Sequence, residues 1–343
     1  MPLIKSISGI RGTIGEREGE DLTKNDIILY TMSFGLWLKS ENRVKSNKIV
    51  VGRDARVSGL MVQGLVLETL TKMGFDVVCL GLSTTPTVEI AVPIENADAG
   101  IIITASHNPR EWNALKLLNN KGEFINAEDG KNLMSIADSN PTFDENINLG
   151  SVTFNDSYID THIDLILKLP FIDSESIKRR KFKVVVDAVN STGGIAIPKL
   201  LERLGVETIK LYCDPTGEFP HNPEPLKENL SDLSKLVVNQ AADLGIVVDP
   251  DVDRLAFVSE DGEVFGEEYT LVACADYYLK HNPGNTVSNL SSSRALRDVS
   301  DLNGCNHFFS AVGEVNVVEL MKKKNAVIGG EGNGGIIIPD LHY

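Results

Sequence analysis

A strand–helix–strand unit that occurs three times in this 343-residue chain restricts the possible folds most strongly. In the first copy, an apolar strand at residues 48–51 precedes an amphipathic segment that ends at Gly74, and a second strand covers 77–80. A glycine there readily adopts the left-handed conformation that ends a helix. Strands that alternate with helices predict α/β domains.

The second and third copies follow the same order. The second has strands at 183–186 and 208–212, separated by an apolar-periodic segment and Gly205. The third is weaker, with strands at 286–290 and 308–312 on either side of a helix-like segment. A repeat of about one hundred residues is too long for a solenoid, so it indicates duplicated domains.

Chain length and polar stretches predict where the domains divide. A chain of 343 residues exceeds the size at which one core keeps growing, so we expect two or three domains. A polar stretch at 139–150 and the turn after Val258 are reasonable boundaries. The predicted domains are 1–150, 151–257 and 258–343.

The charge balance excludes two classes of partner. With 33 basic and 48 acidic side chains, the formal net charge is −15, which opposes wide contact with nucleic acid or an anionic membrane. It permits a small anionic substrate, because such a ligand needs only a local group of Arg, Lys and backbone N–H donors.

Cysteine spacing and the N-terminal segment indicate a cytoplasmic protein. No C-x-x-C pair suggests a zinc or redox site, and we expect reduced, buried thiols at Cys79, Cys213, Cys274 and Cys305. Residues 1–12 lack the apolar region of a signal peptide, and no apolar run approaches the roughly 20 residues of a membrane span.

A serine follows the strand-like segment 100–103, in the loop Thr104–Pro109. The Ser106 hydroxyl can face a ligand there, and a helix starting after Pro109 would direct free N–H groups toward an anion. A simple Ser turn is the alternative, and for an isolated S-H-N-P sequence it is the better one. A hydrolase serine is disfavoured, because no G-x-S-x-G is present and His107 is adjacent in sequence.

Three aspartates follow the apolar strand 244–248, in the sequence Asp249-Pro-Asp251-Val-Asp253-Arg. Carboxylates at this spacing share one face of an extended segment, where they repel unless a cation lies between them. Oxygen ligands suit Mg²⁺, whereas the Gly and Glu of an EF-hand are missing. A solvated acidic turn and an Asp-nucleophile phosphatase are the alternatives.

Three further motifs are weak individually. Arg11 stands between glycines in 6–12, where it can contact phosphate, although a plain turn explains this segment equally well. Lys116 is either a base, a phosphate contact or a solvated lysine. The segment 329–335 has five glycines, so Glu331 and Asn333 can approach a sugar, or the loop is simply flexible.

Together these motifs resemble the α-D-phosphohexomutase superfamily, which includes phosphoglucomutase, phosphomannomutase and phosphoglucosamine mutase. The matching segments are Ser8–Gly12, Thr104–Pro109, Asp249–Arg254 and Gly330–Gly334, in the order and spacing of the family across the whole chain. The serine and aspartate motifs are highly specific as a pair, whereas the glycine loop alone is not.

The resemblance implies three similar α/β domains with mixed sheets flanked by helices, and a role for each motif. Ser106 would carry the transferable phosphate and, with Asp249, Asp251 and Asp253, would bind one Mg²⁺ per chain. The further residues implied at the catalytic centre are Arg11, His107, Lys116 and Arg254. The residues implied to bind the sugar are Ser8, Gly9, Glu331, Gly332 and Asn333.

The implied reaction interconverts hexose 1-phosphate and hexose 6-phosphate through a sugar 1,6-bisphosphate, which also serves as activator. Positioning and charge neutralisation dominate such phosphoryl transfer. The only partner expected is a small phosphosugar, and the protein is expected to be a monomer or homodimer.

Two departures from the family pattern affect these expectations. Asn333-Gly334-Gly335 replaces a frequent Ser-Gly-His, so a histidine contact is missing and the preferred sugar stays open. The family's fourth C-terminal domain is absent from this chain and the third is expected to be truncated, so we expect little turnover. An Asp-nucleophile sugar-phosphate phosphatase and a non-catalytic sugar-phosphate-binding fragment are the alternative functions.

Overall fold

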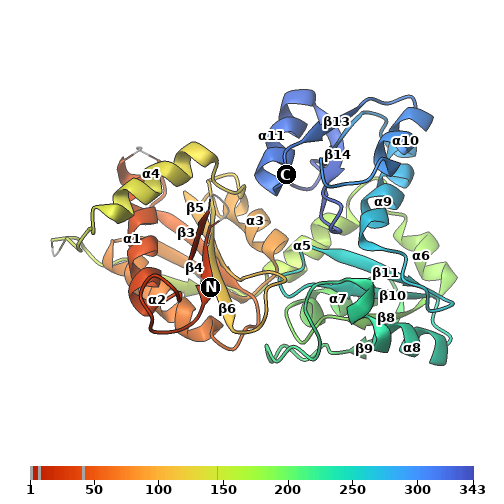
Figure 1. The fold of residues 1–343 in the computed structure, drawn as a ribbon, viewed down its shortest axis with the longest axis horizontal. Coiled ribbons are helices and arrows are strands. Elements are labelled where there is room, and N and C mark those ends of the chain that lie inside the picture. Colours follow the sequence, from red (N-terminus) through yellow and green to blue (C-terminus); the bar gives the residue numbers. More distant parts are fainter. Residues whose placement is uncertain (1–2, 7–8, 41–42, 145) are drawn as a thin grey trace. The chain divides into compact units, whose positions relative to one another are not determined.

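A computed structural model describes residues 3–6, 9–40, 43–144 and 146–343 (Figure 1). The chain divides into two compact units, which are considered separately. The first comprises Met1–Ile159 with Thr216–Glu218, and the second comprises Asp160–Pro215 with Phe219–Tyr343.

The first unit contains a mixed sheet with the strand order β1-β2-β6-β5-β3-β4-β7. Its strands are β1 (Ile4–Ser6), β2 (Gly9–Thr13), β3 (Lys48–Arg53), β4 (Asp76–Leu82), β5 (Ala99–Ile103), β6 (Trp112–Leu118) and β7 (Val152–Phe154). The strands β3, β4, β5 and β7 are parallel, whereas β6 runs antiparallel to both β5 and β2. Every residue of β5 is buried, as expected for a strand with helices on both faces.

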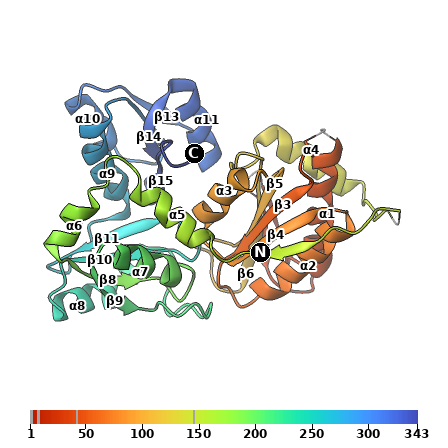
Figure 2. The same cartoon turned by 180° about the vertical axis from the view of Figure 1, so that it is seen from behind.

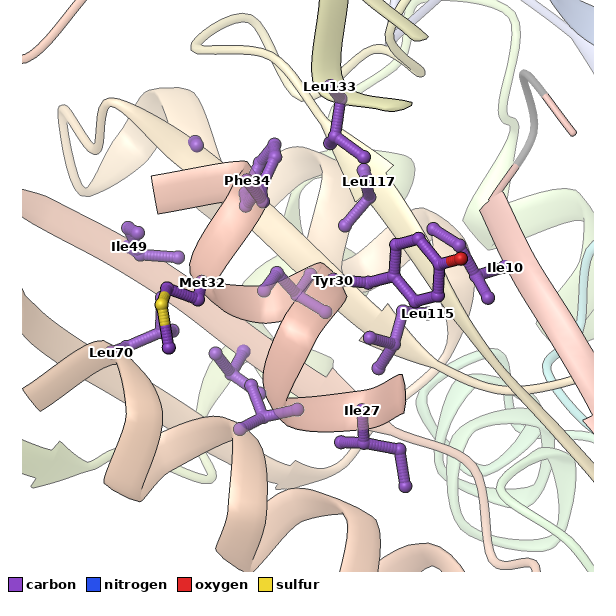
Figure 3. Close-up of a cluster of buried hydrophobic side chains, with 14 of the residues drawn as sticks. Ile10, Ile27, Tyr30, Met32, Phe34, Ile49, Leu70, Leu115, Leu117 and Leu133 are labelled. Carbon is purple, nitrogen blue, oxygen red and sulfur yellow. The ribbon is translucent and has the colours of Figure 1, made fainter. Parts of the chain in front are cut away.

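Helices cover both faces of this sheet. They are α1 (Lys24–Ser40), α2 (Gly59–Lys72), α3 (Thr85–Ile94) and α4 (Ala127–Asp138). Side chains of α1, α2 and α4 form the larger core with the sheet, and Figure 3 shows Tyr30, Phe34 and Leu70 within it. The side chains of α3 pack on the opposite face.

The second unit holds two smaller sheets, and the first of them has the order β11-β10-β8-β9. Its elements are α5 (Tyr158–Leu167, whose first two residues belong to the first unit), α6 (Ser174–Arg180), β8 (Lys183–Asp187), α7 (Gly193–Arg203), β9 (Glu207–Leu211), the short 3-10 helix η1 (Lys227–Asn229), α8 (Ser231–Asn239), β10 (Leu244–Val248) and β11 (Leu255–Ser259). The helices α7 and α8 pack on opposite faces of this sheet (Figure 2).

The last sheet has the order β13-β12-β14-β15. Its elements are α9 (Glu267–His281), β12 (Asn285–Asn289), α10 (Ala295–Leu302), β13 (His307–Ser310), α11 (Glu314–Lys324), β14 (Ala326–Gly330) and β15 (Ile336–Ile337). Side chains of α9 and α10 pack in one cluster and those of α11 in another.

The same four-strand order recurs in all three sheets. The orders β4-β3-β5-β6, β9-β8-β10-β11 and β13-β12-β14-β15 each place three parallel strands beside one antiparallel strand. The serine loop, the aspartates and the glycine loop each connect the third of these strands to the fourth. The duplication inferred from the sequence therefore places all three motifs at one topological position.

Most sequence-based expectations for the fold are confirmed. The three α/β domains are present, and Gly74, Gly205 and Gly304 all have positive φ at the ends of their helices. The domain boundaries at 150 and 257 stay predictions. The helix considered after Pro109 does not form, because the chain passes through a turn directly into β6.

The thiols are less uniform than expected. Cys79 and Cys213 are buried, whereas Cys274 and Cys305 are partly exposed, and all four are free. Burial raises the pKa of the Cys213 thiol to about 11, which makes it a poor nucleophile at neutral pH. Across the described residues, no helix combines the length and apolar character needed to cross a membrane.

Candidate active site

The serine loop begins where β5 ends, in the first unit. Ser106 is buried and has a φ of 49°, a left-handed conformation that side chains other than glycine rarely adopt. Its Oγ lies 3.4 Å from Nδ1 of His107, which is long for a hydrogen bond. His107 therefore contacts the serine hydroxyl only weakly.

Arg11 and Lys116 share a face of the first sheet. Register places Arg11 of β2 opposite Ala114 of β6, and Lys116 lies two residues further along β6. Alternation along a strand then directs both side chains to one face. Thr104, the first residue of the serine loop, donates its backbone N–H to Ala114 O at 3.2 Å. The sheet thus brings both cations near the start of the loop.

The two cations have different surroundings. Within the described residues, the buried Nε of Arg11 has no hydrogen-bond partner. A buried donor without a partner is costly, which makes it a candidate contact for an anion. Lys116 Nζ lies 5.7 Å from the centre of the Phe124 ring, within reach of a cation–π interaction.

The N-terminal glycine motif is only partly described. Ser8, a predicted sugar contact, lies outside the described residues. Gly9 has a φ of 123°, and a Cβ there would lie 2.2 Å from Leu115 O. The close approach of β2 to β6 therefore requires a glycine at this position.

The three aspartates lie in the turn between β10 and β11, in the second unit. One carboxylate oxygen from each of Asp249, Asp251 and Asp253 can be chosen so that all three lie within 4.8 Å of one another. Asp249 and Asp251 are fully buried, whereas Asp253 is partly exposed. The three carboxylates are close together, as the sequence predicted. The prediction that they lie on an extended segment was wrong, because Asp251 lies in a turn and the next residue, Val252, has a φ of 65°.

Local hydrogen bonds give this turn its shape. Oδ1 of Asp249 accepts from the backbone N–H groups of Asp253 and Arg254, each at 3.1 Å. The carbonyl of Pro250 accepts from Ser191 Oγ at 2.6 Å and from Thr192 Oγ1 at 2.9 Å. The turn is therefore fixed both from within and by the residues that precede α7.

The electrostatics of the turn favour a bound cation. Two ionised carboxylates with oxygens no more than 4.8 Å apart repel by at least about 3 kcal/mol at an effective dielectric constant near 20. The Arg254 guanidinium does not cancel this charge alone, since it forms an ion pair with Glu224 at 2.7 Å. An oxygen-only donor set of this charge fits Mg²⁺.

The glycine loop connects β14 and β15 and positions Glu331. Oε1 of Glu331 accepts hydrogen bonds from Asn289 Nδ2 at 2.6 Å and from the Gly313 backbone N–H at 2.9 Å. Asn333 Nδ2 lies 3.4 Å from the other carboxylate oxygen of Glu331. The Glu331 side chain is therefore fixed by the last residue of β12 and by the residue that precedes α11.

The aspartate turn and the glycine loop touch within the second unit. The Leu255 backbone N–H, just beyond the aspartates, donates to Gly334 O at 3.2 Å. Gly334 has a φ of 90°, and a Cβ there would lie 2.3 Å from Leu255 O. Two motifs that lie about 80 residues apart in sequence thus share a backbone contact that requires glycine.

Sequence reasoning missed a buried ion pair beside the serine. Arg56 Nε and Asp54 Oδ2 lie 2.9 Å apart, and both side chains are 0% exposed. The segment that carries them follows β3, which pairs with β5, so it meets the serine loop at one edge of the sheet. The sequence did contain a sign of this pair, because two charged residues directly follow an apolar strand.

A second missed pair lies beside the aspartate sheet. His221 Nε2 lies 3.0 Å from Oδ2 of Asp187, the last residue of β8. Burial of His221 opposes its charging, but the hydrogen bond and the negative charge of Asp187 outweigh this, so the pKa of His221 is raised. The imidazole is therefore more readily protonated than a free histidine.

Comparison with protein families covers most of the chain. Residues 3–143, 156–262 and 266–343 match the alpha/beta/alpha domains I, II and III of phosphoglucomutase/phosphomannomutase. These matches follow the three sheets, which agrees with their common strand order.

Individual relatives agree with the family match. A phosphoglucomutase/phosphomannomutase of Thermococcus kodakarensis is 35% identical over 96% of this chain and 73% of its own length. A phosphoglucosamine mutase of Sulfurovum is 33% identical over 97% of this chain and 74% of its own length. A solved family structure from Burkholderia thailandensis is 27% identical, with a TM-score of 0.84, over 99% of this chain and 74% of that one.

Proposed function

The chain belongs to the phosphoglucomutase/phosphomannomutase family of phosphohexomutases, and on this premise we propose that Ser106 is its phosphoryl carrier. Such an enzyme is an isomerase that transfers phosphate within one hexose. The observation that carries the assignment of the site is the cluster of Asp249, Asp251 and Asp253 in a chain with this membership.

Ser106 serves as donor and then as acceptor. Phosphoserine gives its phosphoryl group to the free hydroxyl of a hexose phosphate, which forms a sugar 1,6-bisphosphate. The second phosphate of that intermediate then returns to Ser106 Oγ. Arg11 and Lys116, on the same face of the sheet, contact phosphoryl oxygens, and Lys116 assists proton transfer.

Asp249, Asp251 and Asp253, together with the phosphorylated Ser106, would supply the oxygen ligands of Mg²⁺. When bound, this ion supplies Lewis-acid polarisation of the phosphoryl group. The Asp249 carboxylate is fixed by two backbone N–H groups of the turn, so its orientation is set before a ligand arrives. The Arg254 guanidinium lies close by and neutralises phosphate charge.

Glu331 accepts hydrogen bonds from sugar hydroxyls, with Gly332 and Asn333 beside it. The fixed Glu331 carboxylate favours this role, because its orientation is set by Asn289 and Gly313. The named relatives act on glucose, mannose and glucosamine phosphates, so these three sugars are the substrates that we propose to test. A cytoplasmic location stays a prediction.

Mass spectrometry tests this function directly. Incubation with glucose 1,6-bisphosphate and Mg²⁺ should add one phosphate to the chain, located on Ser106. Ser106→Ala should take up none and should show no mutase activity above background, since the carrier is gone.

Other sites of modification would contradict the proposal. Phosphate on Asp249 with release of inorganic phosphate would instead indicate an Asp-nucleophile phosphatase. Binding of hexose phosphates without any phosphorylated residue would indicate a non-catalytic protein. Asp261→Ala, at an exposed acidic residue outside the turn, is the matched control and should retain both uptake and activity.

A further inference from the structure

One buried side chain holds much of the serine loop. The Arg56 guanidinium donates to four backbone carbonyls: through Nη1 to Pro109 at 2.5 Å and Trp112 at 3.1 Å, and through Nη2 to Asn108 at 2.7 Å and to Ser106. Loops rarely meet a buried charge in this way, because a charge needs full compensation there. The carbonyls supply part of that compensation, and Asp54 supplies the remainder.

Asp54 connects this guanidinium to the other side of the serine. Its Oδ2 accepts from Arg56 Nε at 2.9 Å and from Thr104 Oγ1 at 2.7 Å. Thr104 Oγ1 in turn accepts the Ser106 backbone N–H at 2.9 Å. The N–H of Ser106 is thus held through Thr104 and its carbonyl through Arg56.

This arrangement explains the backbone of Ser106. A left-handed φ of 49° is unfavourable for serine and persists only where the surroundings determine it. Two hydrogen bonds, from the Ser106 N–H to Thr104 and from Arg56 to the Ser106 carbonyl, hold the residue in this conformation. Because strained, rigidly held residues concentrate at functional sites, the geometry points to a role beyond folding.

We propose that Asp54, Arg56 and Thr104 are positioning residues that hold Ser106 for phosphoryl transfer. The inference rests on the proposed function of Ser106. Phosphoryl transfer depends on alignment, and a displacement of about 1 Å can cost about 100-fold in rate. Ser106 must align in both half-reactions, so its backbone is the part of the loop where rigidity matters most.

Thr104 offers the cleanest test, because its hydroxyl can be removed without leaving the buried guanidinium unpaired. Thr104→Val preserves shape and loses the bond to the Ser106 N–H, whereas Thr104→Ser keeps a hydroxyl. Thr104→Val should lower kcat, and the rate of Ser106 phosphorylation by glucose 1,6-bisphosphate, by about 10-fold to 100-fold with KM unchanged. Thr104→Ser should stay within about threefold of the wild type.

Thr286→Val is the matched control. Thr286 is also fully buried, and its hydroxyl has two side-chain partners, Ser300 Oγ at 2.7 Å and His307 Nδ1 at 2.8 Å, in a different sheet. A loss of buried hydroxyl bonds there should leave kcat unchanged. Peptide hydrogen exchange should show faster exchange at the Ser106 N–H in Thr104→Val and not in Thr286→Val.

Two results would overturn the inference while the proposed function stands: wild-type transfer rates in Thr104→Val, or equal losses in Thr104→Val and Thr104→Ser. A wild-type chain that takes up no phosphate on Ser106 would instead refute the proposed function, and the positioning role with it.

Discussion

The serine loop and the aspartate turn occupy the same topological position in different sheets, yet different charged side chains shape them. Each connects a parallel strand to the antiparallel strand beside it, at β5–β6 and β10–β11. A buried guanidinium underlies the first, whereas the second gathers three carboxylates within 4.8 Å. The fold therefore supplies a place for a loop, and the side chains decide which ligand it suits.

The two loops also depend on their neighbours in a similar way. Residues that follow the adjacent parallel strand hold backbone groups of each loop: Arg56 holds the Ser106 carbonyl, and Ser191 holds the Pro250 carbonyl. The difference lies in the charges: the Arg56 guanidinium is paired with Asp54, whereas the aspartate turn brings three carboxylates within 4.8 Å of one another. The aspartate turn is therefore the one of the two that we expect to bind a cation.

Removal of the guanidinium should give the largest effect on stability. Arg56→Gln removes the cation that pairs with buried Asp54 and the donor to four backbone carbonyls, so we expect a loss of about 3–5 kcal/mol in unfolding free energy. Both tryptophans, Trp37 and Trp112, lie in the first unit, so their fluorescence in urea reports this transition.

Arg17→Gln is the control for this measurement. Arg17 pairs with Asp21 at 2.7 Å in the same unit, but its side chain is 65% exposed, so we expect a much smaller loss. Equal losses in the two variants would remove the distinction between the serine-loop pair and an ordinary ion pair.

Removal of one carboxylate from the aspartate turn should raise the stability of the protein, rather than lower it, when metal is absent. Asp251→Asn relieves repulsion in the turn and should stabilise the metal-free second unit by about 1 kcal/mol. Mg²⁺ at 100 times its Kd should stabilise the wild type by about 2.7 kcal/mol and the variant far less. Hydrogen exchange of peptides from β10 and β11 measures both changes, and an equal response to Mg²⁺ would contradict the metal site.

Gly334→Ala should disturb the aspartate turn from the neighbouring loop. The added Cβ would meet Leu255 O at 2.3 Å with a φ of 90°, so we expect a loss of about 2 kcal/mol. At Gly332 the nearest atom is a carboxylate oxygen at the end of the Glu268 side chain, which can shift more readily than a backbone carbonyl, so Gly332→Ala should cost less. Thermal unfolding compares the two, and equal midpoints would show that the Leu255 contact is unimportant.

Two histidines of the second unit should show the smallest effects, with opposite pH dependence. The pKa of His221 is raised, so its contribution to stability is complete below its unfolded pKa and is lost as pH rises through the folded pKa. Burial lowers the pKa of His307 to about 4, so stability is lost as pH falls from about 6.5 toward 4.

The corresponding variants should separate these two contributions. The stability difference between His221→Gln and the wild type should therefore be largest in mild acid. The His307→Gln difference should be largest above neutrality. Parallel pH profiles for the two variants would contradict these assignments.

The sequence predicts the fold well because both of its signals are local. Apolar runs and helix-ending glycines such as Gly74 and Gly205 depend on neighbouring residues only, and these elements lie where expected. The aspartate cluster was also predicted, since residues two apart in sequence stay close in a strand or a turn. The turn conformation of that segment could not be predicted, because nothing in the sequence around Val252 indicates a positive φ.

The contacts that position the serine could not be predicted in the same way. Arg56 lies 50 residues before Ser106, and their contact depends on the pairing of β3 with β5 rather than on any nearby pattern. Asn289 and Glu331 are similarly far apart in sequence. Side chains that support a site from another strand become visible only once the strand order is known.

The hydrogen bond from Leu255 to Gly334 gives the second unit a thermodynamic property as well as a shape. This bond connects β11, which follows the aspartate turn, to the loop that carries Glu331, so the two segments cannot move independently at this point. If, as proposed, the aspartate turn binds the cation and the Glu331 loop binds the sugar, any free energy by which the bound cation tightens sugar binding appears in equal amount as tighter cation binding when sugar is present.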